Sequence, residues 1–220
     1  MNFNGVARIY EPLARLVFGT EHRRAEAFFL PEVPEQSRVL LVGGGAGHLL
    51  EMLLQHRRPE AVAFLEPSLA MRRRAANRVA RVPGAQRVVF LQKSGELAGH
   101  ARYDVLMTPF VLDLFPDAQL NTEFLPPLLA ALTPEARWLF TDFVQPRTRA
   151  QALLVSTMYV FFGLVAGIPA RRLPDYAAAF AAASFRKTAV RFFGGGMMES
   201  AVLRRFPPGK EEHEAAGHAI

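Results

Sequence analysis

The sequence predicts an α/β domain in which a mostly parallel sheet is covered by helices on both faces. Short aliphatic runs alternate along the chain with longer segments of helical periodicity, a pattern that builds β-α-β units. Near the C-terminus two strand-like runs meet at residues 194–196, which are three glycines, and this hairpin adds an antiparallel edge to the sheet. With 220 residues, half of them hydrophobic, the chain suits one such domain.

Five runs have the length and composition of buried strands. They are Arg38–Val42, Ala61–Leu65, Arg87–Leu91, Tyr103–Met107 and Arg137–Asp142. Between them, helices are predicted over residues 46–57, 68–80 and 120–132, with a looser segment at 94–101. Ser68 is the expected N-cap of the second helix, because a serine side chain can accept a backbone N–H of the first turn.

The remaining segments are predicted to be helices and a tail. Residues 5–30 carry an apolar stripe divided near Gly19, so residues 1–32 should form an N-terminal helical lid. A helical insert, or cap, is expected over residues 147–183, and the polar residues 207–220 are expected to be disordered. Residues 1–206 would then form a single domain. The sequence shows no signal-peptide pattern, so the expected localisation is cytoplasmic.

Residues 150–170 contain no charged side chain, and a run of this length could cross a bilayer. The run lies between a central strand and the closing hairpin, however, where a membrane span would separate two parts of one sheet. We therefore expect no transmembrane span but a buried cap helix or one wall of an apolar pocket. This interpretation leaves peripheral contact with a membrane open.

The formal net charge is +6 and comes mostly from arginine. The densest cluster is at residues 71–82, where Arg74, Arg78 and Arg81 share one helical face. No aromatic residues interleave with these arginines, so a solvated helix face is favoured over a nucleic-acid site. The chain has no cysteine, which excludes disulfides, thiolate metal sites and cysteine nucleophiles, and no metal site is expected.

The strongest candidate for a ligand site is the turn in "RVLLVGGGAGHLLEMLL", residues 38–54. Gly43, Gly45 and Gly47 join a strand to a helix, whose N-terminal N–H groups favour an anion or polar ligand groups. A dinucleotide fingerprint would require a glycine where the sequence has His48. Glu66 ends the next strand, where a carboxylate can accept both hydroxyls of a ribose lying across the turn. Facing a cleft, it should contribute to binding more than to stability.

Together, the G-x-G-x-G spacing and Glu66 resemble class I S-adenosylmethionine-dependent methyltransferases, and the resemblance covers most of the chain. "YEPLARLVFG", residues 10–19, resembles the N-terminal helix of the subgroup related to ubiquinone and menaquinone C-methyltransferases. "YDVLMTPFVLDLFP" resembles the fourth strand and its loop, while "ARWLFTDF" and "FRKTAVRFFGGGMMESAVLRR" resemble the last three strands. The family implies a Rossmann-like three-layer sandwich with strand order 3-2-1-4-5-7-6, and S-adenosylmethionine as the cofactor.

The resemblance also assigns roles to single residues. The three glycines would let the backbone approach the methionine part of the cofactor, and Glu66 would bind the ribose. The other cofactor residues would be Pro67 beside the adenosine, Ser94 and Gly95 along the adenine edge, and Thr108 and Pro109 below the sulfonium, with Phe110. Two family acids are replaced. Leu41 stands in place of an acid that helps hold the cofactor's amino group. Ser94, or Lys93 in a shifted register, replaces the acid that accepts the adenine amino group.

The expected acceptor is a small, hydrophobic molecule, because the loop after the fourth strand is mostly apolar. Its candidate contacts are Tyr10, Phe18, Phe110, Asp113 and Tyr159. Asp113, His22 and His48 are titratable groups near the expected cleft, but the sequence assigns no catalytic residue and no oligomeric state. Two alternatives stay open: a non-catalytic S-adenosylmethionine-binding descendant of the fold, and an aminopropyltransferase resembling spermidine synthase.

Overall fold

The computed structural model describes residues 20–99, 101–149, 151–157, 170 and 172–206. The first lid segment with Tyr10 and Phe18, most of the uncharged insert with Tyr159, and the C-terminal tail lie outside the described residues.

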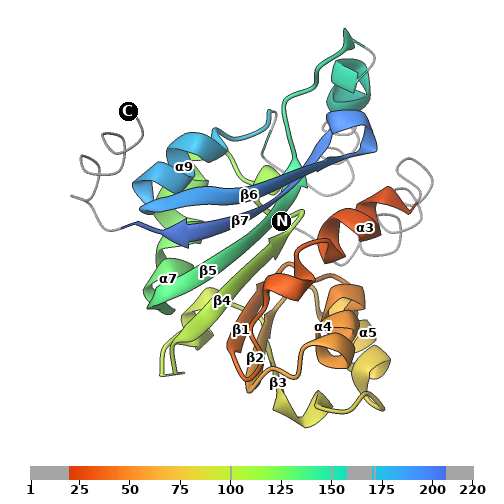
Figure 1. The fold of residues 1–220 in the computed structure, drawn as a ribbon, viewed down its shortest axis with the longest axis vertical. Helices are drawn as coiled ribbons and strands as arrows, with labels where there is room; N and C mark the ends of the chain where they lie inside the picture. The colour runs from red at the N-terminus through yellow and green to blue at the C-terminus, as the bar shows by residue number, and fades with distance from the viewer. Residues whose placement is uncertain (1–19, 100, 150, 158–169, 171, 207–220) are drawn as a thin grey trace, which may run out of the picture.

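The described residues form a seven-stranded sheet in the order β3-β2-β1-β4-β5-β7-β6, which confirms the predicted fold class and topology (Figure 1). The five parallel strands are β1 (Arg38–Val42), β2 (Ala61–Leu65), β3 (Val88–Leu91), β4 (Tyr103–Pro109) and β5 (Leu132–Phe143). The antiparallel hairpin consists of β6 (Phe185–Phe193) and β7 (Met198–Arg205), joined by a 3-10 turn at Gly194–Gly196.

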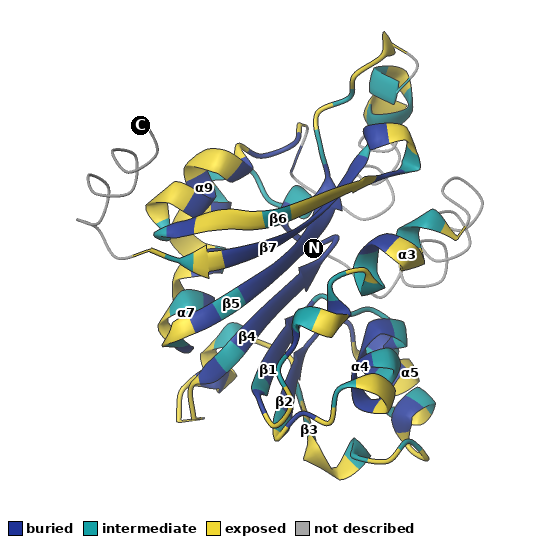
Figure 2. Ribbon diagram, in the orientation of Figure 1, coloured by how far each residue is buried: buried dark blue, intermediate teal, exposed yellow. Residues whose placement is uncertain are grey.

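Helices cover both faces of the sheet. On one face, α4 (His48–His56) and α5 (Leu69–Val79) pack their apolar sides against β1, β2 and β4. On the other face lie α7 (Leu125–Ala130) and α9 (Tyr176–Ala182), around a core centred on Trp138. β4, β5 and β7 are buried between these layers, whereas the edge strand β6 is mostly exposed (Figure 2). The strand ends and the edge strands β6 and β3 are therefore the accessible parts of the sheet.

Two predicted elements differ from the structure. The predicted helix at 120–132 is α6 (Asp117–Gln119), a π-helical turn (Leu120–Phe124) and α7, because Pro126 and Pro127 supply no N–H for a continuous ladder. β5 begins at Leu132 rather than Arg137. Its pairing with β4 is irregular between Tyr103 and Val105, so a strand interrupted by Pro134 and Glu135 still joins the sheet.

Less regular segments flank the sheet. The second part of the predicted lid is α3 (Glu21–Ala27), followed by a 3-10 helix at Leu30–Glu32. Within the predicted insert, residues 151–157 are helical and residues 172–175 are not. In the part of the chain that the structure describes, no helix is long and apolar enough to cross a membrane.

Candidate functional site

The glycine turn lies at the carboxyl end of β1, between that strand and α4. Gly43, Gly45 and Gly47 have φ angles of +73°, +54° and +83°, a backbone region that favours glycine. The Gly43 N–H donates to the Leu65 carbonyl of β2 at 2.9 Å, which fixes the turn to the neighbouring strand. Gly47 is the N-cap of α4, so no capping side chain accepts a hydrogen bond from the first N–H groups of this helix.

The three glycines differ in what an added side chain would meet. A Cβ at Gly43 would lie 2.8 Å from the Val111 Cβ, and one at Gly47 would lie 2.7 Å from the Ala75 Cβ of α5. These two glycines therefore allow the protein to pack against its own side chains. A Cβ at Gly45 would meet no protein atom within 4 Å. Gly45 is thus the position in this motif where a ligand can reach the backbone.

Glu66 follows β2 and is bonded to this same position. Its Oε2 accepts the Gly45 N–H at 3.2 Å, and its Oε1 accepts the Ser68 N–H at 2.9 Å. Burial raises the pKa of the carboxyl, while the hydrogen bonds from Ser68 and Gly45 and the charge of Arg72 oppose the rise. Each oxygen keeps acceptor capacity for a ligand hydroxyl. Because Glu66 also holds the turn, its removal should cost stability, contrary to the expectation from sequence.

Arg72 connects the ends of β2 and β3. Its guanidinium donates to the Glu66 carbonyl at 2.6 Å, the Pro67 carbonyl at 3.2 Å and the Gln92 Oε1 at 3.1 Å. Pro67 and the following Leu69 are exposed, and Leu69 retains 46% of its surface. An apolar side chain in this position can pack against a flat ring.

Ser94 and Gly95 lie in a 3-10 helix, Ser94–Leu97, directly after β3. An acid, Glu96, follows two residues after Ser94, which stands where the family has an acid. The Glu96 Oε1 accepts the backbone N–H of Gln92 at 3.1 Å and that of Lys93 at 2.8 Å. This carboxylate therefore stabilises the turn after β3, a role that sequence reasoning did not assign to it.

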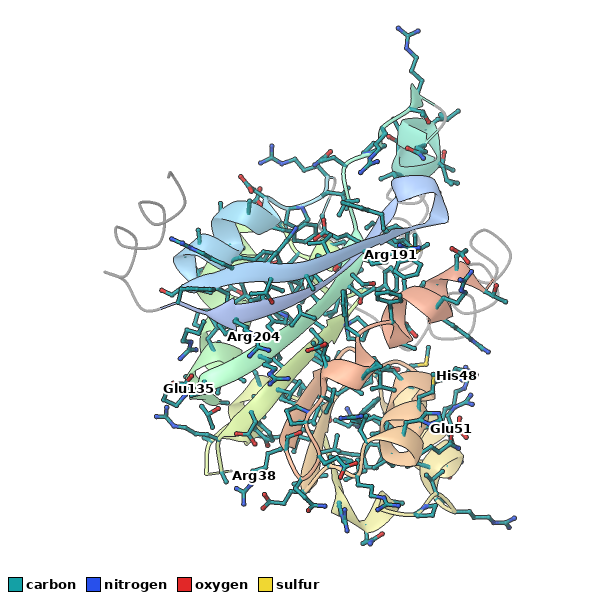
Figure 3. All side chains as sticks on the ribbon, in the orientation of Figure 1. Arg38, His48, Glu51, Glu135, Arg191 and Arg204 are labelled. Carbon is teal, nitrogen blue, oxygen red and sulfur yellow. The ribbon has the colours of Figure 1, made fainter. Side chains whose placement is uncertain are left out.

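The lid helix α3 contacts both the glycine turn and the sheet. The Arg23 Nη2 and the His48 Nε2, at the first residue of α4, are 2.9 Å apart (His48 is labelled in Figure 3). The Ser200 hydroxyl of β7 donates to the Ala25 carbonyl at 2.8 Å. These two contacts fix the helix across the carboxyl ends of the strands.

His22 lies on the inner side of α3. Its ring stacks on Phe110 with centroids 4.0 Å apart, and its Nδ1 lies 3.5 Å from the Glu26 Oε1. Burial and, to a smaller extent, the Arg23 charge together lower the pKa of His22 to about 4, so the imidazole is neutral near pH 7. The sequence offered no partner for this histidine, because Phe110 is distant in the chain.

An apolar cluster occupies the carboxyl ends of β4 and β5. Its buried members come from segments that are far apart in the chain: Ala25, Phe110, Phe143, Leu173, Phe193 and Met198. Leu154 and Met197 are partly buried and pack against them. Phe110 has a φ of +48°, which a bulky residue rarely adopts, and its N–H donates to the Thr141 carbonyl at 2.7 Å. The backbone here holds an aromatic ring against His22 of α3.

Asp113 does not stand alone after β4. It forms a buried carboxyl pair with Asp142 of β5, whose Oδ2 accepts the backbone N–H groups of Leu112 at 2.9 Å and Asp113 at 3.2 Å. Burial raises the pKa of Asp113 to about 7. Burial and the Asp113 charge raise the pKa of Asp142 well above its usual range. The pair fixes the loop that carries Val111 against Gly43.

Thr108 and Pro109 have different surroundings. Thr108 is fully buried and its hydroxyl accepts the Trp138 Nε1–H at 2.8 Å, so its side chain faces the core below α9 rather than the turn. Pro109 lines a cavity of about 10 Å³ with Glu26, Phe29 and Thr141, room for about one water. Among the described residues, no group of three or more histidines and acids could hold a metal ion.

No protein-family model and no curated protein sequence matches this chain. Solved structures do match it over most of its length. The mitomycin 7-O-methyltransferase MmcR is 18% identical with a TM-score of 0.66, over 94% of this chain and 61% of that chain, so the present chain spans about three fifths of MmcR.

Two further structures match a larger share of their own chains. 1,6-Didemethyltoxoflavin-N1-methyltransferase of Burkholderia thailandensis, solved with 1,6-didemethyltoxoflavin and S-adenosylhomocysteine, is 18% identical with a TM-score of 0.66, over 92% of this chain and 85% of that chain. Magnesium protoporphyrin IX methyltransferase of Synechocystis PCC 6803, with bound S-adenosylhomocysteine, is 16% identical with a TM-score of 0.60, over 84% and 82%. The chain has the fold of class I methyltransferases.

Proposed function

We propose that this chain is an S-adenosylmethionine-dependent methyltransferase that acts on a small, hydrophobic acceptor. The observation that carries the proposal is the open approach to Gly45, whose N–H is bonded to the buried Glu66 carboxylate. In a turn built only for packing, protein side chains would occupy the space beside all three glycines, as they do beside Gly43 and Gly47.

The cofactor would lie along the carboxyl ends of β1, β2 and β3. Its methionine part would meet the backbone at Gly45, and its ribose hydroxyls would donate to Glu66. Pro67 and Leu69 would contact the adenine from one side, and Ser94 and Gly95 from the other. In the structurally similar enzymes of Burkholderia and Synechocystis, S-adenosylhomocysteine is bound to the same fold.

S-adenosylmethionine supplies an activated methyl group when bound. The protein has to align the acceptor in line with the methyl, exclude water and receive a proton where the nucleophile carries one. The apolar cluster around Phe110 and Phe143 suits the first two tasks, and α3 covers it. His22 is a weak candidate for the third, because its imidazole lies against Phe110 but its pKa of about 4 makes it a poor proton acceptor near pH 7.

The two alternatives find less support. An aminopropyltransferase would need carboxylates for a cationic acceptor after β4, whereas the carboxyl of Asp113 is engaged with Asp142 there. A non-catalytic descendant would share the cofactor site, so only turnover separates it from an enzyme. The likeness to quinone C-methyltransferases rests chiefly on residues 10–19, outside the described residues, and stays a prediction, as does a cytoplasmic location.

Calorimetric titration of the full chain with S-adenosylhomocysteine tests the proposal. Gly45→Ala should weaken binding by about tenfold or more, because a Cβ would project into the ligand's approach. Gly99→Ala is the matched control: Gly99 also has a positive φ, of +92°, and also has no protein atom within 4 Å of a Cβ. Both variants should lose about 1 kcal/mol of stability to backbone strain, but only the first should lose affinity.

Two outcomes would contradict the proposal. Wild-type protein that gives neither heat nor a thermal shift with millimolar ligand has no cofactor site. Equal loss of affinity in both variants would show that strain, rather than the approach to Gly45, sets binding. If the ligand binds but methyl-labelled S-adenosylmethionine transfers no label to a panel of apolar acceptors, the non-catalytic alternative is favoured.

A further inference from the structure

Three arginines lie side by side across the exposed end of the sheet. Arg204 of β7 is the register partner of Arg137 on β5 and of Arg186 on β6. Register partners in antiparallel strands share one face with Cβ atoms about 5 Å apart, where like charges repel. Side chains of like charge that lie opposite one another in this way destabilise a sheet.

The irregular pairing of β6 adds a fourth arginine to the same face. Arg186 and Arg191 are five residues apart, so in a regular strand they would point to opposite faces. The register shifts between Lys187 and Ala189, and Arg191 then pairs with Ser200 while Arg186 pairs with Arg204. Ser200 bonds to α3, so both arginines lie on the α3 face of the sheet.

The arginines of this row differ in their charged partners. Arg137 has an ion pair with Glu32 at 3.8 Å and donates to the Glu32 carbonyl at 2.8 Å. For Arg204 and Arg191, both exposed, no carboxylate within the described residues forms an ion pair (both arginines are labelled in Figure 3). The planar guanidinium group of arginine can donate two parallel hydrogen bonds to the oxygens of a phosphate group.

Aromatic side chains stand beside the arginines. The Arg191 guanidinium lies 5.8 Å from the centre of the Phe28 ring, and the Arg186 guanidinium lies 5.4 Å from that of Phe206. Phe28 and Phe206 keep 46% and 40% of their surface exposed. A guanidinium group lies over one face of each ring, so at most the other face is free for the base stacking on which single-stranded nucleic acid depends. Exposed phenyl edges beside arginines suit the boundary between headgroups and acyl chains.

We propose that this arginine face, Arg137, Arg186, Arg191 and Arg204 with Phe28 and Phe206, is a docking surface for an anionic phospholipid membrane. The arginines would bind lipid phosphates and the two phenyl rings would enter the interface. The surface continues toward the apolar cluster, since Phe28 contacts Phe193 with ring centroids 5.4 Å apart. A hydrophobic acceptor could then enter from the bilayer; this last step alone rests on the proposed methyltransferase function.

Vesicle sedimentation of the full chain, without cofactor, tests the surface. Wild-type protein should bind phosphatidylcholine vesicles that contain phosphatidylglycerol, should bind pure phosphatidylcholine vesicles much less, and should be released by salt. The double variant Arg186→Gln/Arg204→Gln should bind the anionic vesicles about 30-fold more weakly, the equivalent of about 2 kcal/mol for two juxtamembrane charges. The control Arg73→Gln/Arg81→Gln removes the same charge from and just beyond α5, and its binding should be unchanged.

Several results would overturn the docking surface. Wild-type protein that ignores anionic vesicles, or binds them equally in high salt, refutes it without any variant. If the control Arg73→Gln/Arg81→Gln loses as much vesicle binding, then the net charge of the protein, rather than this surface, determines binding. Tighter binding to single-stranded or duplex nucleic acid, lost in the Arg186/Arg204 variant, would make the surface a nucleic-acid site. S-adenosylhomocysteine titration of the same variants is independent: normal vesicle binding without cofactor binding would refute the methyltransferase and leave the docking surface standing.

Discussion

Replacing His22 by phenylalanine should remove one component of the dependence of stability on pH while keeping a ring stacked on Phe110. In the folded protein, burial lowers the pKa of His22 from 6.5 to about 4. Between these values the unfolded chain binds a proton that the folded protein excludes. The contribution of His22 to stability is therefore fully present above pH 6.5 and is lost as the pH falls toward about 4.

The size of the effect follows from the two pKa values. Each pH unit between them is worth about 1.4 kcal/mol, and the His22 side chain is only 14% exposed, so solvent screening is small. Between about pH 7.5 and about pH 5, His22 should cost the wild-type protein about 2 kcal/mol, rising to about 3 kcal/mol near pH 4.

Other buried acids act in the opposite direction over the same range. Asp113, Asp142 and Glu66 have raised pKa values, so each stabilises the fold when protonated, and that contribution is lost as the pH rises. A single stability curve therefore cannot isolate His22. The difference in unfolding free energy between wild type and His22→Phe does isolate it, because both proteins carry these acids and keep Arg23 and Glu26 beside the ring.

Urea unfolding followed by circular dichroism at a series of pH values measures this difference. As the pH falls from about 7.5 to about 5, wild type should lose about 2 kcal/mol of stability relative to His22→Phe. His56→Gln, at the exposed end of α4, controls for the loss of a histidine elsewhere. Curves for wild type and His22→Phe that run parallel would refute the reasoning, because they would mean that folding does not change the proton affinity of His22.

Two further predictions concern packing. Gly47→Ala should destabilise the protein by about 2 kcal/mol or more in urea unfolding, since its Cβ would lie 2.7 Å from the Ala75 Cβ and its φ of +83° disfavours alanine; a cost no larger than that of Gly45→Ala would contradict the packing role. Trp138→Phe should cost about 1–3 kcal/mol by the same measurement, because the buried Thr108 hydroxyl loses its 2.8 Å donor; adding Thr108→Val should recover part of that loss.

The sequence predicted β1 and β2 to the residue because each is a continuous apolar run with abrupt polar or glycine ends. The start of β5 could not be predicted in this way. Residues 133–136 include a proline and a glutamate, which favour a loop locally, yet the flanking Leu132 and Arg137 both pair with β4 and so draw the segment into the sheet. The N-cap at Ser68 was predictable, since its contact with the Met71 N–H is local.

The candidate site, too, was predictable from the sequence only where its contacts are local. The glycine turn and Glu66 are read from neighbouring loops of adjacent strands, so spacing alone places them together. The His22–Phe110 stack and the Asp113–Asp142 pair join segments that are far apart in the chain, and only packing brings them into contact. The arginines of α5 were predicted to be a solvated face, but Arg78 donates to the Ala46 carbonyl at 2.9 Å and so supports the glycine turn.

Because this chain has other residues in place of two acids of the family, at Leu41 and Ser94, Glu66 becomes more important to the proposed cofactor site. Leu41 is fully buried among the side chains beneath α4, where a carboxylate would have no water and would cost free energy. Glu96 uses one oxygen to hold the backbone of Gln92 and Lys93. Glu66 is then the carboxylate best placed for a charge-assisted hydrogen bond with the cofactor. Glu66→Gln should therefore weaken S-adenosylhomocysteine binding by about 1.5–3 kcal/mol, whereas Glu96→Gln should barely change it.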